Sequence, residues 1–139
     1  MIENRKVINI CQGCNYEINA PKGICLIKNA SDGLPIRCVG KWSKEKHYYL
    51  KGYIDIFTKA MRRKWHGHLN YIDLFAGPGK CSVRNNGEEI DGSPLIVLKN
   101  EVPFEYCFFV EIDKDILKVL EKRCENYINS RNIFFLGGD

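Results

Sequence analysis

A glycine-rich turn after a predicted strand is the clearest chemical feature of the sequence. Residues 69 to 75, LNYIDLF, have the apolar and aromatic content of a strand, and the turn AGPGK follows directly. Gly77 and Gly79 can adopt positive φ and let a ligand approach the backbone closely. Asp73 ends the strand, where its carboxylate can accept hydrogen bonds from turn amides or from the ammonium group of an amino-acid ligand. Because the turn begins with an acid and is not GxGxxG, it disfavours a nicotinamide dinucleotide.

Acidic residues also end the next two predicted strands. Residues 106 to 112, YCFFVEI, contain Glu111, with Asp113 two positions on, and residues 132 to 136, NIFFL, are followed by Gly-Gly-Asp139. A carboxylate at the second strand end can accept both ribose hydroxyls, and one at the third can accept the exocyclic amine of adenine. Each acid alone is equally consistent with a solvated strand end. Together, in this order, they predict a site for an adenosine linked to a cationic amino acid.

The elements that must position these residues alternate along the chain. Ser93 and Pro94 provide an N-cap and a first-turn proline for a short helix over LIVLKN, and DKDILKVLEKRCENYI has the period of an amphipathic helix. The resulting order of strand, helix, strand, helix, strand predicts an α/β fold with a parallel sheet. A further amphipathic helix is expected before the first strand, with Ser43 as its N-cap. Its predicted apolar face comprises Leu50, Tyr53, Ile54, Phe57, Ala60 and Met61.

The seven cysteines are unevenly distributed, and four of them lie in a loop-rich segment over residues 1 to 40. An odd number of cysteines without an export signal makes disulfides an unattractive explanation. Cys11 and Cys14 have the spacing of a metal-chelating turn, and two later cysteines can complete a four-thiolate structural zinc site. The alternative is free thiols in a flexible segment, since the remaining spacings match no standard zinc finger. The predicted ligands are Cys11, Cys14, Cys25 and Cys38.

Composition and charge restrict the classes of protein to consider. Hydrophobic residues make up 45% and charged residues 27% of the 139, a globular balance, and no apolar run approaches the length of about 20 residues that spans a bilayer. We therefore expect a cytoplasmic protein.

Between Arg37 and Lys64 there are nine Lys or Arg residues and two acids, with aromatic residues nearby (Trp42, Tyr48, Tyr49 and Trp65). This segment could bind nucleic acid, although a solvated helix face also explains it.

Several motifs together resemble the three-Cys-motif partner family, bacterial proteins related to class I methyltransferases. The similar runs cover about residues 32 to 139 and are DGLPIRCVGKW, KHYYLKGYIDIF, YIDLFAGPGKC, GEEIDGSPLIVL and FFVEID. The resemblance implies a Rossmann-like fold that binds S-adenosylmethionine, with Asp73, Gly77 and Gly79 at the methionine end, Glu111 at the ribose and Asp139 near the adenine. Phe75, within the same turn, belongs to the predicted cofactor-binding set. In that family the three-cysteine motif belongs to a companion protein, a radical-S-adenosylmethionine-like neighbour, so the cysteines of this chain do not explain the family name.

The sequence therefore predicts two regions: residues 1–40 as the cysteine-containing segment, and residues 41–139 as the amino-terminal part of a Rossmann-like domain. Glu111 follows Asp73 by 38 positions, about twice the spacing of about 20 residues in dinucleotide folds, so residues 80 to 92 are expected to form an inserted loop. We expect the remainder of the domain or another chain to cover the first strand. On that expectation the 139 residues alone are not an active enzyme.

The leading hypothesis is an S-adenosylmethionine-dependent methyltransferase-like protein whose methyl acceptor and catalytic residues the sequence does not name. One alternative is a zinc-stabilised nucleic-acid-binding module. The other is a catalytically silent partner subunit of the radical-S-adenosylmethionine-like companion. Binding of the cofactor distinguishes the first alternative from the leading hypothesis.

Overall fold

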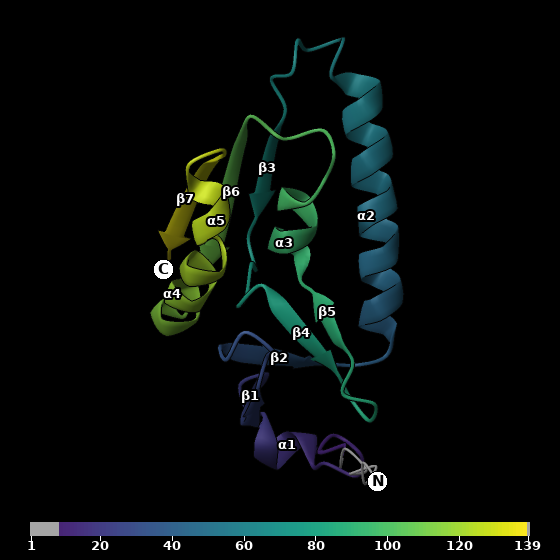
Figure 1. The fold of residues 1–139 in the computed structure, drawn as a ribbon, viewed down its shortest axis with the longest axis vertical. Helices are drawn as coiled ribbons and strands as arrows, with labels where there is room; N and C mark the ends of the chain where they lie inside the picture. The colour runs from purple at the N-terminus through teal and green to yellow at the C-terminus, as the bar shows by residue number, and fades with distance from the viewer. Residues whose placement is uncertain (1–8, 139) are drawn as a thin grey trace, which may run out of the picture.

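A computed structural model describes residues 9–138, and these residues form two sheets with helices packed around them. The parallel sheet lies at one end of the molecule and the four-stranded sheet at the other, while the long helix α2 runs alongside (Figure 1). The elements are α1 (Tyr16–Asn19), β1 (Ile24–Asn29), β2 (Pro35–Val39), α2 (Trp42–Met61), β3 (Asn70–Asp73), β4 (Lys80–Val83), β5 (Glu89–Asp91), α3 (Ser93–Leu98), β6 (Tyr106–Glu111), α4 (Lys114–Arg123), α5 (Glu125–Ile128) and β7 (Asn132–Gly137).

The three strands that the sequence predicts form one parallel sheet in the order β3-β6-β7. In its register Asp73 pairs with Phe109, and Glu111 pairs with Gly137. The predicted alternation of strands and helices in an α/β chain with a parallel sheet is thus confirmed. Since carboxyl ends of parallel strands meet at one edge, the acids that end β3 and β6 lie at the same end of the sheet.

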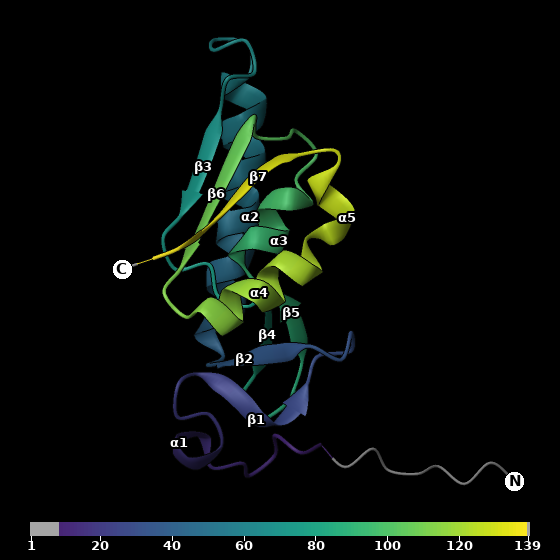
Figure 2. The same cartoon turned by 90° about the vertical axis from the view of Figure 1, so that its left-hand side faces the viewer.

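The hydrophobic core lies on one face of the parallel sheet. Phe109 and Cys107 from β6 are buried there against Leu120 and Cys124 of the α4 region, and Ile54 of α2 belongs to the same cluster. The opposite face is apolar but exposed, and on it the rings of Phe108 and Phe134 stack at 5.1 Å between centroids. Figure 2 views the strands from this side, with α2 and α3 behind them. The exposed large side chains of this face include Ile72, Tyr106, Phe134 and Leu136.

The second sheet has the strand order β1-β2-β4-β5 and joins distant parts of the sequence. β1 and β2 form an antiparallel hairpin, and β2 pairs in parallel with β4, so that Cys38 lies beside Ser82. Residues 80 to 92, expected as an inserted loop, instead form the hairpin β4-β5, whose turn places Asn85 and Gly87 at φ of 74° and 69°. The polar letters RNNGEE mark this turn, whereas Lys80–Val83 before it is largely buried strand. Strand pairing therefore crosses the predicted boundary at residue 40.

The N-cap residues of two helices differ from those predicted. α2 begins at Trp42 after Lys41, whose backbone is already helical, so Ser43 lies inside the helix and is buried. α3 begins at Ser93 with Gly92 as its N-cap, so Ser93 lies inside the helix, where its hydroxyl donates to the Asp73 carboxylate; Pro94 stands in the first turn, as predicted.

The predicted apolar face of α2 is also partly wrong. Leu50, Ile54, Phe57 and Met61 contact or form part of the core, as expected, but Tyr53 is exposed. Ala60 is exposed too, and Thr58 occupies a buried position in the core-facing stripe because its hydroxyl donates to the Ile54 carbonyl. Across residues 9–138 we find no helix that combines the length and the apolar character needed to cross a bilayer.

Candidate functional site

The glycine-rich turn after β3 is held by carboxylates from the ends of two strands. Gly77 and Gly79 have φ of 65° and 89°, as the sequence predicts for such a turn. Oδ1 of Asp73 accepts a hydrogen bond from the Phe75 amide at 3.1 Å. Oε2 of Glu111 accepts one from the Gly77 amide at 2.9 Å. The structure thus brings together Asp73, Gly77 and Glu111, which are separated in sequence.

Glu111 is the central acid of this arrangement and is 7% exposed. Its Oε1 atom also accepts from the Asp113 amide at 3.1 Å, so each carboxylate oxygen already has one backbone donor. A carboxylate has about four acceptor positions, which leaves roughly two free. These two positions are enough for a pair of vicinal hydroxyls.

Arg37 of β2 is a site residue that the sequence analysis did not single out. Its guanidinium lies 3.9 Å from Oε2 of Glu111. A Cβ atom added at Gly77 would lie 3.1 Å from Arg37 Nε, so the missing side chain at Gly77 makes room for this cation. In the sequence, Arg37 is marked only as one cation of the basic segment. Its place beside Glu111 depends on the pairing of β2 with a strand more than 40 residues later, which the local sequence does not reveal.

A cavity of about 660 Å³ opens beside this turn. Its size falls in the range of roughly 300–1,000 Å³ that holds small organic ligands. One wall is the β1-β2 hairpin and the residues before it, and the other is the carboxyl end of the parallel sheet. Phe75, which is 88% exposed, presents an apolar ring at the opening. The lining residues are Pro21, Lys22, Ile24, Leu26, Arg37, Phe75, Glu111, Ile112, Asp113 and Ile116.

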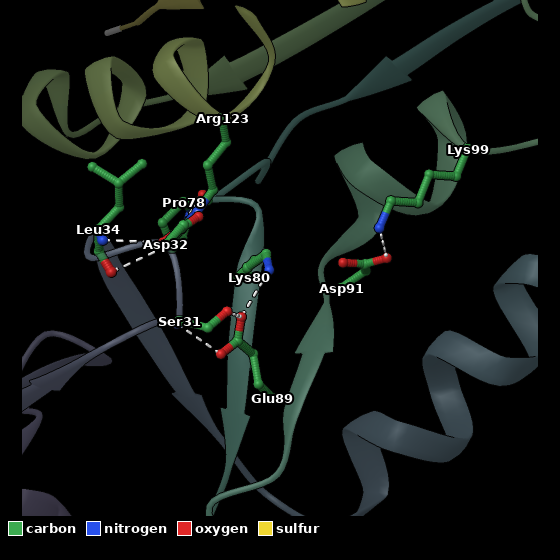
Figure 3. A network of polar contacts seen from close by, with 9 residues as sticks. All are labelled: Ser31, Asp32, Leu34, Pro78, Lys80, Glu89, Asp91, Lys99 and Arg123. Carbon is green, nitrogen blue, oxygen red and sulfur yellow. Dashed lines mark hydrogen bonds and ion pairs between the residues drawn. The ribbon is translucent and has the colours of Figure 1, made fainter. Parts of the chain in front are cut away.

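Arg123 of α4 forms hydrogen bonds both to the β1-β2 hairpin, which is one wall of the cavity, and to the glycine-rich turn. Its side chain is 2% exposed and donates to the Pro78 carbonyl at 2.6 Å and to the Leu34 carbonyl at 3.1 Å. It also forms a bidentate pair with Asp32 at 2.8 and 2.9 Å (Figure 3). The hydrogen bond from Arg123 is the main cause that lowers the pKa of Asp32 to about 2. One buried guanidinium therefore fixes the distance between the two walls of the cavity.

A second polar cluster in Figure 3 holds the β4-β5 hairpin. Glu89 accepts from the Ser31 amide at 2.9 Å and from Lys80 at 2.7 Å, while Lys99 pairs with Asp91 at 2.7 Å. These contacts tie the hairpin to the β1-β2 turn on one side and to α3 on the other. The inserted segment is therefore part of the scaffold of the site.

The remaining predicted site residues have different outcomes. Asp139 lies outside the described residues, so its predicted contact with adenine stays a prediction. The four predicted zinc ligands line one small cavity on the far side of β2. Within residues 9–138, no three His, Cys, Asp or Glu side chains are already arranged to hold a metal ion.

Comparisons with family models, with curated proteins and with solved structures found no significant match to this chain.

Proposed function

We propose that this chain forms the S-adenosylmethionine-binding part of a class I methyltransferase-like protein with a Rossmann-like sheet. The observation that carries the proposal is the glycine turn at the carboxyl end of β3, whose Gly77 amide is bonded to the acid that ends β6 beside a cavity of about 660 Å³. In open parallel sheets, ligands bind outside the carboxyl ends of the strands. The resemblance of YIDLFAGPGKC and FFVEID to the three-Cys-motif partner family supports the same cofactor.

The residues of the cavity suit the parts of this cofactor. The two acceptor positions left on Glu111 suit the ribose hydroxyls, and Phe75 and Ile112 offer apolar surface for the adenine. Arg37 is the cation available for the carboxylate of the methionine moiety. Asp73 does not line the cavity and already accepts from the Phe75 amide and the Ser93 hydroxyl, so its predicted contact with the ammonium group stays a prediction. When bound, the cofactor supplies a methyl group on a sulfonium, which can be transferred to a nucleophile.

Calorimetric titration tests the proposal. S-adenosylhomocysteine should bind and NAD should not, because the acids at the strand ends complement a cationic amino acid and the turn lacks a pyrophosphate-binding GxGxxG. Glu111→Gln should weaken binding of S-adenosylhomocysteine by about 1 to 3 kcal/mol, the scale for losing hydrogen bonds to a charged acceptor.

Asp91→Asn provides the matched control, since Asp91 also pairs with a cation but lies outside the cavity. Its affinity for S-adenosylhomocysteine should equal that of the unmodified chain. Binding of NAD without any heat from S-adenosylhomocysteine would contradict the proposal.

The outer face of α2 supports a second candidate function, the binding of single-stranded nucleic acid. Tyr48, Tyr49 and Tyr53 are all exposed there, and Lys46 lies over the exposed Trp42 ring at 5.8 Å. Aromatic rings beside lysines can stack bases and contact phosphates. This function would be established if the chain binds a single-stranded oligonucleotide, if the affinity falls steeply with salt, and if Tyr48→Ala and Tyr49→Ala abolish the binding.

A further inference from the structure

Four cysteines that are far apart in sequence converge on a single cavity. Cys11 and Cys14 come from the turn before α1, Cys25 from β1 and Cys38 from β2. Ile24 pairs with Arg37, so Cys25 and Cys38 lie diagonally across the antiparallel pair and point to the same face. Cys11 reaches the same place, since its Sγ lies 3.8 Å from Ser82 Oγ, and Ser82 is the β4 neighbour of Cys38. The three remaining cysteines do not line this cavity.

The turn between the first two cysteines has the conformation of a chelating loop. The Cys14 amide donates to the Cys11 carbonyl at 3.4 Å, and Gly13 between them has φ of 74°. This conformation folds Cys11 and Cys14 back toward each other. Two thiolates spaced in this way can bind one tetrahedral ion.

Two side-chain donors, from Asn19 and Arg84, line the cysteine cavity. Nδ2 of Asn19 donates to Cys14 Sγ at 3.3 Å. Nε of Arg84 is buried at the cavity wall and has no hydrogen-bond partner among residues 9–138, although the Arg84 guanidinium stacks on Tyr16 at 4.1 Å. A buried donor without a partner is costly, and an ionised thiolate is an acceptor that would satisfy it. Such outer donors are the usual surroundings of metal-bound thiolates.

The size of the cavity restricts what it can hold. Its volume is about 20 Å³. That is enough for about one water-sized particle and too small for an organic ligand. Four cysteines lining a space of this size provide the ligand set of a structural zinc ion.

We propose that Cys11, Cys14, Cys25 and Cys38 bind one structural zinc ion, with Arg84 and Asn19 as donors to the coordinating sulfurs. The four thiols lose their protons to solvent and form four Zn–S bonds. The side chains must move to do so, because within residues 9–138 no three of them are already placed to hold an ion. The resulting site carries a net negative charge, which Arg84 offsets. Four thiolates leave no open position, so the ion does not take part in catalysis.

The ion would also stabilise the cofactor cavity. Cys38 and Arg37 are neighbours on β2 and point to opposite faces, Cys38 into the cysteine cavity and Arg37 toward Glu111. The zinc site is independent of the proposed cofactor, and its metal content can be measured without any ligand.

Elemental analysis of the reduced chain, purified without added metal, tests the proposal. We expect about one zinc atom per chain. Cys14→Ala and Cys25→Ala should each lose most of it. Cys81→Ala is the matched control, because Cys81 is buried in the same sheet but does not line the cavity, and it should keep its zinc. Arg84→Ala should lower zinc affinity by about 10- to 100-fold.

Cobalt substitution in the unmodified chain gives a measurement that does not depend on how the variants fold. A tetrahedral tetrathiolate site should produce intense visible bands and a sulfur-to-cobalt charge-transfer band. Absence of zinc from the reduced chain, equal zinc content in Cys25→Ala and Cys81→Ala, or iron with sulfide in place of zinc would each overturn the proposal.

Discussion

Removing Arg123 should destabilise the protein much more than removing its acidic partner. In Arg123→Ala, the carbonyls of Pro78 and Leu34 and the Asp32 carboxylate each lose a donor, although the Leu34 carbonyl keeps the Ala30 amide and Asp32 keeps the Leu34 amide. Because the guanidinium is almost fully buried, we expect a loss of about 3 to 5 kcal/mol in the free energy of unfolding. The Asp32 side chain is 32% exposed, so water can replace part of its pairing, and Asp32→Asn should cost about 1 kcal/mol.

The pair should also make stability depend on pH. The folded-state pKa of Asp32, about 2, is below the ordinary value of 3.8, so its contribution is complete above pH 4 and is lost as the pH falls toward 2. A shift of this size corresponds to at most about 2.4 kcal/mol, which solvent screening of the partly exposed carboxylate reduces to about 1 kcal/mol.

Urea unfolding followed by circular dichroism at pH 7 and pH 3 measures both effects. The unmodified chain should lose more stability between these two pH values than Asp32→Asn, by up to about 1 kcal/mol. Equal destabilisation by Arg123→Ala and Asp32→Asn would refute the role of the two carbonyls. An unchanged pH dependence in Asp32→Asn would refute the effect of the pair on titration.

Two further outcomes follow from the structure. Gly77→Ala should lower the free energy of unfolding by about 1 to 3 kcal/mol, because φ of 65° is strained for alanine and the new Cβ would lie 3.1 Å from Arg37. The same substitution should weaken binding of S-adenosylhomocysteine in calorimetry. The control Gly33→Ala, with φ of 79° and open space around the new Cβ, should change only stability. The 139-residue chain should self-associate through the exposed apolar face of the parallel sheet. Sedimentation should therefore show assemblies, and Phe134→Ser should reduce them. A stable monomer at all concentrations would exclude this association.

The parallel sheet and its turn were predictable because their signals are local. An apolar strand followed by glycines, or ended by an acid, is visible within about ten residues of sequence, and Asp73, Gly77 and Glu111 were found in this way. The spacing of Cys11 and Cys14 indicated a chelating turn, whereas Cys25 and Cys38 reach the same cavity through the pairing of β1 with β2.

The features that were missed depend on contacts between distant residues. Arg37 reaches Glu111 only because β2 pairs with β4, and Arg123 reaches the hairpin from the last turn of α4. The contact of the Ser93 hydroxyl with the Asp73 carboxylate, 20 positions away, also depends on the fold. Polar sequence alone did not distinguish the β4-β5 hairpin from a loop.

A crystal structure of the chain with S-adenosylhomocysteine tests the central claim most directly. The proposal predicts ligand in the cavity between the β1-β2 hairpin and the end of β6, with the ribose hydroxyls on Glu111 and the ligand carboxylate near Arg37. Ligand bound elsewhere, or a cavity that stays free of ligand at saturating concentration, would contradict it.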